Sequence, residues 1–355
     1  MSSRLESTPK AHQDTFGWIF RDDDPKNQPQ PWNSFTNWLK STDNANIYWI
    51  TGKPGSGKST FMKYLAQDPR ILLWLGQWSD GYQLIKAGFY FWNSGTAMQM
   101  SRMGLLRALL HSSLKTDLAL IMHLFGELWE QFITFRGGRD EFTWPELRCA
   151  FKSLVSDKSR KFFFLIDGLD EFDGSPDELI KLIIEASARP NVKICTASRP
   201  WLPFEDAFKN RPGLLLEQLT HKDISLYVSS KFDENLHYTR LKRRQLDHAS
   251  NLVRNVINKA SGVFLWVYLV VESLLQGLSN SDRVLDLQNR LNALPGDLEA
   301  LFDNLLDRID PVYFKQSARY SGFSGHIPHP LCYNYRSRMG KTLNEASKLS
   351  AGLSA

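Results

Sequence analysis

The stretch GKPGSGKS, residues 52–59, carries glycines, a lysine and a serine at the spacing that cradles phosphate groups. Its glycines let backbone N–H groups converge on an anion, and a helix that begins where the loop ends favours negative charge there. We expect Lys58 to reach the β- and γ-phosphates of a nucleotide and the Ser59 hydroxyl to bind Mg²⁺. The residues expected to bind the nucleotide are Gly52, Pro54, Gly55, Ser56, Gly57, Lys58, Ser59 and Thr60.

A second stretch, FFFLIDGLDE, joins an apolar run to three carboxylates. Asp167 directly follows five apolar residues, and an ionisable group that closes such a run needs a partner. We expect it to bind Mg²⁺ together with Ser59, because ligands of open α/β sheets bind at the carboxyl ends of the strands. Asp170 and Glu171 follow within one turn and are expected to orient or deprotonate an attacking water. The alternative for this pair is an exposed acidic loop or helix cap.

A third apolar run, ICTASRP, ends with Arg199. An arginine at this edge could touch the terminal phosphate and report its hydrolysis, although an exposed surface arginine is the alternative. The Asn–Lys pair at residues 258–259 is followed by Ala-Ser and lacks the aspartate of a guanine-recognition loop. We therefore expect ATP and ADP as ligands, with GTP left open, and Mg²⁺ as the metal.

Strand and helix patterns alternate around these residues. We expect strands at 46–52, 87–95, 162–166 and 192–199, and helices at 32–39, 58–68, 103–114, 118–132 and 176–188. This alternation predicts an α/β fold, a P-loop NTPase core over residues 46–205 with a mainly parallel sheet flanked by helices. The chain then becomes helical and more charged, which predicts an all-helical domain over 206–295. Residues 1–45 are taken as an N-terminal flanking segment.

The composition is that of a globular protein, with 42% hydrophobic and 23% charged residues in a chain of 355. A net charge of +5 makes a nucleic-acid partner unlikely, and the basic run at 240–244 is interpreted as a solvated helix face. Three scattered cysteines suggest neither a zinc site nor disulfides. The longest apolar run, 263–271, is too short to span a bilayer, so we expect no membrane contact and a cytoplasmic location.

Together these motifs resemble the NACHT branch of the signal-transduction NTPases (the STAND class), especially fungal proteins with a nephrocystin-3-like N-terminal domain. The resemblance covers roughly residues 14–318 and rests on TFGWIF, FTNWL, YWITGKPGSGKSTFMKYL, FYFWNSG, FFFLIDGLDEFDG, KICTASRP, LTHKDISLYV, KASGVFLWVYLVVESL and RLNALPGDLEALFDNLLDRIDPVY. It implies hydrolysis and sensing roles for Asp170, Glu171 and Arg199. It also implies a switch that ADP holds closed and that ATP with Mg²⁺ opens for self-association, in non-self recognition such as heterokaryon incompatibility or in cell-death signalling.

Two departures from the family pattern stand out. The family places an effector domain before the NTPase and a repeat array after it, so these partners are expected as missing domains or as separate proteins. The resemblance stops where a winged-helix domain would begin, at 296–320, and residues 321–355 are expected to be a disordered tail of a truncated chain. The alternatives to a slowly hydrolysing switch are a conventional P-loop ATPase or kinase, and a nucleotide-binding fragment without signalling activity. The signal, the downstream effector and the oligomeric state stay open.

Overall fold

The computed structural model describes residues 3–12, 15–21, 32–43, 45–135, 141–280, 282–298 and 300–301. The expected tail at 321–355 and most of the expected winged-helix start at 296–320 lie outside these described residues. Within the described part of the chain, no helix combines the length and the apolar character needed to cross a bilayer.

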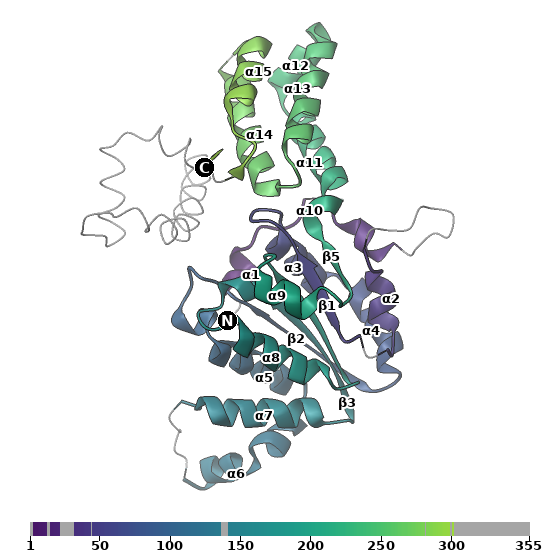
Figure 1. The fold of residues 1–355 in the computed structure, drawn as a ribbon, viewed down its shortest axis with the longest axis vertical. Coiled ribbons are helices and arrows are strands. Elements are labelled where there is room, and N and C mark those ends of the chain that lie inside the picture. Colours follow the sequence, from purple (N-terminus) through teal and green to yellow (C-terminus); the bar gives the residue numbers. More distant parts are fainter. Residues whose placement is uncertain are drawn as a thin grey trace, which may run out of the picture.

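A five-stranded sheet forms the centre of the molecule (Figure 1). Its strands are β1 (Ile47–Thr51), β2 (Gln83–Tyr90), β3 (Arg160–Asp167), β4 (Val192–Ser198) and β5 (Gly213–Leu215). They lie in the order β2-β3-β4-β1-β5, and every neighbouring pair runs parallel. All seven residues of β4 are buried, which is typical of a parallel strand covered on both faces.

Helices cover both faces of the sheet. The helices α2 (Phe35–Lys40), α3 (Lys58–Gln67) and α4 (Arg70–Ser79) share one apolar core with Phe163 and Leu165 of β3. Residues of α5 (Arg102–Thr116), α7 (Trp144–Ser156), α8 (Pro176–Ser187) and α9 (Leu202–Phe208) share the other core with Phe162 and Phe164. Alternate side chains of the apolar run in β3 therefore enter opposite cores, as the period of a strand requires.

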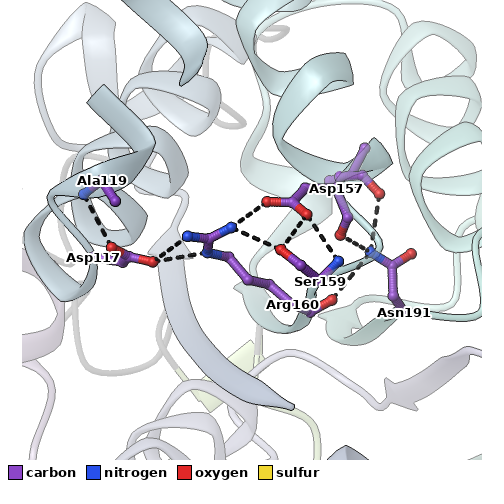
Figure 2. A network of polar contacts seen from close by, with 7 residues as sticks. Asp117, Ala119, Asp157, Ser159, Arg160 and Asn191 are labelled. Atoms are coloured by element: carbon purple, nitrogen blue, oxygen red, sulfur yellow. Dashed lines mark hydrogen bonds and ion pairs between the residues drawn. The ribbon is translucent and has the colours of Figure 1, made fainter. Parts of the chain in front are cut away.

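A polar network anchors the start of β3, at the end of the strand away from Asp167 (Figure 2). The Arg160 side chain donates to Asp117, which follows α5, at 2.7 Å and also pairs with Asp157, which follows α7. The Asn191 side-chain amide donates to the carbonyl oxygen of Asp157 at 2.8 Å. The network therefore fixes the loops at this edge of the sheet, remote from the predicted site.

The sequence-based prediction missed three helices of this domain, α4, α7 and α9. The sequence predicts no helix after Pro69, yet α4 begins at Arg70 with Pro69 as its N-cap residue. Proline at a helix start loses no hydrogen bond, so it begins a helix here as well as ending the one before it. The helix α7 was missed too, although Thr143 and Glu146 form a capping box at its start. The helix α6 (Ala119–Phe135) packs against α7.

The described parts of the N-terminal flank pack onto the folded core, which the polar composition of the flank does not predict. It contains α1 (Ser3–Ser7) and the short helix η1 (Gly17–Phe20). Phe16 is buried and its ring lies 5.0 Å from that of Phe61 in α3. The buried Lys63, also in α3, donates to the carbonyl oxygen of Thr8 at 2.5 Å. The flank is thus tied to the helix that follows the phosphate loop.

A helical region follows the sheet and has an apolar core of its own. Its helices are α10 (Leu216–Leu219), α11 (His221–Asp233), α12 (Leu236–Arg244), α13 (Leu246–Lys259), α14 (Phe264–Ser279) and α15 (Val284–Ala293). Figure 1 shows α11 to α15 grouped at one end of the molecule, with α6 and α7 at the other. The parallel sheet flanked by helices and the helical region after it confirm the expected fold class.

Candidate functional site

The predicted phosphate loop connects β1 to α3, the strand–loop–helix context that its motif requires. Gly55 and Gly57 have φ angles of 72° and 95°, a left-handed conformation that glycine adopts without strain. Gly57 is the N-cap residue of α3, and no side chain caps this helix. The free N–H groups of an uncapped first turn favour an anion. Pro54 is exposed in the loop, whereas Thr60 lies in the first turn of α3.

Lys58 bends back over its own loop. Its Nζ donates to the carbonyl oxygens of Gly52 at 2.6 Å and Lys53 at 2.9 Å. Burial lowers the pKa of Lys58, and the nearby carboxylates of Asp170 and Asp167 oppose this shift. Carbonyl oxygens of the loop therefore hold the Lys58 ammonium group. A bound phosphate can replace them as its hydrogen-bond partners.

Asp167 closes β3 with a side chain that is 1% exposed. Burial raises the pKa of its carboxyl to about 6, while a hydrogen bond from the Ser59 side chain lowers it. Its Oδ2 is buried and has no hydrogen-bond partner among the described residues. A carboxylate and a hydroxyl side by side are the hard oxygen ligands that Mg²⁺ prefers, with phosphates and waters completing the shell.

No group of three or more His, Cys, Asp or Glu side chains in the described part of the chain could hold a metal ion without further ligands. The Asp167 carboxylate and the Ser59 hydroxyl fit a cation that arrives with a phosphate, as Mg²⁺ does.

Four buried side-chain atoms find no hydrogen-bond partner within the described residues, and all of them adjoin the loop or the acidic segment. They are Thr51 Oγ1, Ser56 Oγ, Asp167 Oδ2 and Arg4 Nε. A buried polar atom left unpaired costs on the order of 1–3 kcal/mol, so native proteins rarely leave several in one place. Ser56 Oγ belongs to the phosphate loop and Asp167 Oδ2 to the acidic segment, so each of the two stretches holds an unpaired buried oxygen, which fits a polar ligand bound between them.

Asp170 and Arg199 form a close pair at the ends of β3 and β4. The Asp170 Oδ1 accepts from the Arg199 backbone N–H at 2.9 Å, and its Oδ2 lies 3.0 Å from Arg199 Nε. The Asp170 side chain is only 5% exposed, whereas that of Arg199 is 35% exposed. Both oxygens of Asp170 thus hold the arginine, and the outer part of the guanidinium stays open to solvent or ligand.

Glu171 has different partners from its neighbour. Its Oε2 accepts from the Asn93 backbone N–H at 3.0 Å, and its Oε1 lies 3.4 Å from the Arg4 guanidinium. Burial raises the pKa of the Glu171 carboxyl, and the positive charge of Arg4 opposes that rise. A carboxyl with a raised pKa is a better proton acceptor, which suits a general base.

The helical region lies directly against the phosphate loop, a contact that sequence reasoning did not foresee. The Leu265 backbone N–H, in α14, donates to the Gly55 carbonyl oxygen at 3.0 Å. A Cβ atom on Gly55 would meet side-chain atoms of Val263 and Leu265 at 3.1 Å and of Leu298 at 2.9 Å. From α10, Glu217 Oε2 accepts from the Lys53 backbone N–H at 3.2 Å. No motif marks these residues, because their importance depends only on tertiary placement.

Asp223 joins the N-terminal flank to the helical region. Its buried Oδ2, in α11, accepts from Trp18 Nε1 at 2.8 Å and from the Phe16 backbone N–H at 3.3 Å. Burial raises the pKa of Asp223, and these two hydrogen bonds lower it. Phe16 is itself next to the phosphate loop, since its ring would lie 3.9 Å from a Cβ atom on Gly57. The loop is therefore in contact with both segments that Asp223 connects.

Residues 30–199 match the family model described as "Nephrocystin 3, N-terminal". None of the curated proteins matches this sequence. Among solved structures, "Structure of C. elegans PCH-2" is 15% identical with a TM-score of 0.35, and the match covers 76% of this chain and 66% of that one. "Structure of Drosophila ORC bound to DNA" is 16% identical with a TM-score of 0.36, covering 71% of this chain and 63% of that one.

The matched segment spans slightly less than two thirds of each of those two chains, and at TM-scores below 0.5 neither likeness adds to the argument. The family match, by contrast, extends over α2, the phosphate loop, the acidic segment and β4 up to Arg199. Residues 30–199 of this chain are therefore similar to the N-terminal domain of nephrocystin 3.

Proposed function

We propose that this chain is a nucleotide-binding NTPase module that binds a purine nucleoside triphosphate with Mg²⁺ between the phosphate loop and the acidic segment. The observation that carries the proposal is the phosphate-binding motif in its strand–loop–helix context, with unpaired buried oxygens on Ser56 in the loop and on Asp167 in the acidic segment. The match to the nephrocystin 3 N-terminal family supports it. ATP and ADP are the proposed ligands and GTP the alternative, since the guanine-recognition motif is lacking.

In this proposal each residue of the site has a separate role. The N–H groups of the loop and of the first turn of α3 bind the phosphates, and Lys58 leaves the loop carbonyls to contact them. When bound, Mg²⁺ supplies electrostatic stabilisation of charge on the phosphates, and Ser59 and Asp167 would hold it. Glu171 orients and deprotonates the attacking water, whereas Asp170 aims Arg199 at the terminal phosphate.

The function of the module is a conformational switch with slow hydrolysis. The helical region contacts the loop through Leu265 and Glu217, so a change in the loop on phosphate binding is transmitted directly to that region. A ligand shifts such an equilibrium only by its differential affinity for the two arrangements. We propose that the diphosphate favours the closed arrangement, and that the triphosphate opens it and exposes surface for self-association in a signalling role, such as fungal non-self recognition or cell death.

The proposed switch also assigns a role to each domain of the chain. The NTPase core comprises residues 46–205 and the helical domain 206–295, with 296–320 beginning a further domain. Effector and sensor functions are assigned to other domains or to separate protein partners. The alternatives are a conventional P-loop ATPase or kinase, which would turn over many triphosphates per minute, and a fragment that binds nucleotide without switching.

Nucleotide binding by matched variants tests the site. Lys58→Ala is expected to weaken binding of a fluorescent ATP analogue with Mg²⁺ by at least about 100-fold, because it removes a charge-assisted contact to two phosphates. Lys53→Ala, five residues earlier in the same loop and exposed, is the control and should bind like the wild type. Asp167→Ala should abolish the Mg²⁺ dependence of binding, with the exposed Asp173→Ala as its control. Equal affinities across all four variants would contradict the assignment.

Turnover separates the switch from its alternatives. The switch predicts single-turnover hydrolysis slower than about one per minute, together with a larger particle in light scattering with a non-hydrolysable ATP analogue than with ADP. Rapid steady-state hydrolysis or phosphoryl transfer to a small acceptor would favour the conventional enzyme. Tight nucleotide binding with no change in size or protease sensitivity would favour the inactive fragment.

A further inference from the structure

An arginine from the N-terminal flank reaches the acidic segment. Arg4, in α1, places its guanidinium 3.4 Å from Glu171 Oε1 and 5.5 Å from the centre of the Trp92 ring. The two partners are 167 residues apart in sequence. Their side chains are 23% and 15% exposed, so the pair is largely removed from water. The Nε of Arg4 is buried and has no hydrogen-bond partner among the described residues.

Arg4 is held in a defined place. The Arg4 carbonyl oxygen accepts from the Thr8 backbone N–H at 3.0 Å and from the Thr8 hydroxyl at 2.8 Å, which closes the turn after α1. The Thr8 carbonyl oxygen in turn accepts from Lys63 Nζ, a buried donor in α3. Because α3 begins at the phosphate loop, the position of Arg4 is fixed relative to the site by a short chain of contacts.

Glu171 is fixed by donors from two separate segments. The backbone N–H of Asn93, in the loop after β2, holds one oxygen, and Arg4 holds the other. The charged groups that act on Glu171 also include Asp170 and Arg199, but these two neutralise each other in their own close pair. Arg4 is therefore the cation that compensates the buried charge of Glu171.

We propose that Arg4 is a positioning residue, which holds the Glu171 carboxylate ionised and aimed at the water that attacks the terminal phosphate. This inference rests on the proposed function, in which Glu171 is the general base. The physical reason is that burial disfavours the carboxylate, while a guanidinium at hydrogen-bonding distance favours it and restricts its rotation. The N-terminal flank would thus be part of the hydrolytic machinery of the domain, and its displacement by a partner would slow hydrolysis without releasing nucleotide.

Single-turnover hydrolysis and nucleotide affinity, measured together on the full chain, test this inference. Arg4→Ala is expected to lower the rate of the chemical step about tenfold or more, because a misplaced general base loses much of its typical 10²–10⁴-fold contribution. The affinity for ATP with Mg²⁺ should stay within about twofold, since Arg4 contacts no phosphate in this assignment. Arg4→Lys, which keeps the charge, should recover part of the rate. Lys10→Ala, an exposed cation of the same flank, is the matched control and should hydrolyse like the wild type.

The outcomes distinguish this inference from the proposed function. If Glu171→Ala loses hydrolysis while Arg4→Ala keeps the wild-type rate, Arg4 has no positioning role and the inference is overturned. If Arg4→Ala only lowers the melting temperature, or if Arg4→Lys is as slow as Arg4→Ala, the inference fails as well. If Glu171→Ala itself hydrolyses normally, the assigned general base is wrong and the proposed mechanism fails with it.

Discussion

Asp167→Asn should make the nucleotide-free protein more stable while destroying its Mg²⁺ site. Asparagine has the shape and the neutrality of the protonated aspartic acid, so the substitution removes only the cost of burying the negative charge. Burial raises the pKa of Asp167 from 3.8 to about 6, a shift of roughly two units. At about 1.4 kcal/mol per unit, the charged side chain costs the folded state about 3 kcal/mol at neutral pH.

The sign of the pH dependence follows from the raised pKa. Below pH 3.8 the Asp167 carboxyl is protonated in both the folded and the unfolded protein, so the folded state does not have to bury a charge. This stabilising contribution of the neutral carboxyl is lost as the pH rises through about 6. The stability advantage of Asp167→Asn over the wild type should therefore grow from about 1.5 kcal/mol at about pH 5 to about 3 kcal/mol at about pH 7.5. Urea unfolding of both proteins in EDTA, at the two pH values, measures this difference.

A matched control and a second readout complete the experiment. Asp173→Asn, at an exposed position of the same segment, should change the unfolding free energy by less than about 0.5 kcal/mol at either pH. Addition of ATP with Mg²⁺ at about 100 times its dissociation constant should stabilise the wild type by about 2.7 kcal/mol and Asp167→Asn by much less. If Asp167→Asn is no more stable than the wild type, and if the difference between them does not change with pH, then burial does not raise the pKa of Asp167 as stated.

Three further predictions concern the contacts around the site. Asp170→Ala and Arg199→Ala should each slow hydrolysis by about 10–100-fold. Because the two residues act as one unit, the double variant should be no slower than the slower single variant. Additive losses in the double variant would show that the two residues have separate roles. Arg160→Ala should lower the unfolding free energy by about 1–3 kcal/mol in urea and leave nucleotide affinity unchanged, since its network lies at the far end of β3; a changed affinity would contradict that separation. Asp223→Ala removes the acceptor of Trp18 Nε1, so proteolysis between the sheet domain and the helical region should become faster, and an unchanged cleavage rate would show that this contact does not hold the two together.

The core of the site was predictable because its signals are local. The phosphate loop needs only eight consecutive residues, and Asp167 is marked by the apolar run before it. The strands β1, β3 and β4 were found close to their observed limits for the same reason. The expected second strand was shifted, since β2 begins at Gln83 and ends at Tyr90, before the turn at residues 93–95. The polar residues Gln83 and Lys86 interrupt the apolar pattern of its first half, on which the prediction depended.

The remaining parts of the site could not be found in this way. The contacts Arg4–Glu171, Lys53–Glu217 and Trp18–Asp223 join residues more than 160 positions apart. The polar side chains that make these contacts lie in segments whose periodicity says nothing about their partners. The distinct partners of the nearby carboxylates Asp170 and Glu171 were also hidden, because the sequence gives no way to tell which of the two faces Arg199.

A crystal structure of the full chain with Mg²⁺ and a non-hydrolysable ATP analogue would show the proposed site directly. We expect the phosphates to lie against the N–H groups of residues 55–60, with Lys58 Nζ moved from the carbonyl oxygens of Gly52 and Lys53 to the phosphates. The metal should lie between Ser59 Oγ and Asp167 Oδ2. A nucleotide bound elsewhere, or one bound at the loop with Lys58 still on its own carbonyl groups and no metal at Asp167, would contradict the account.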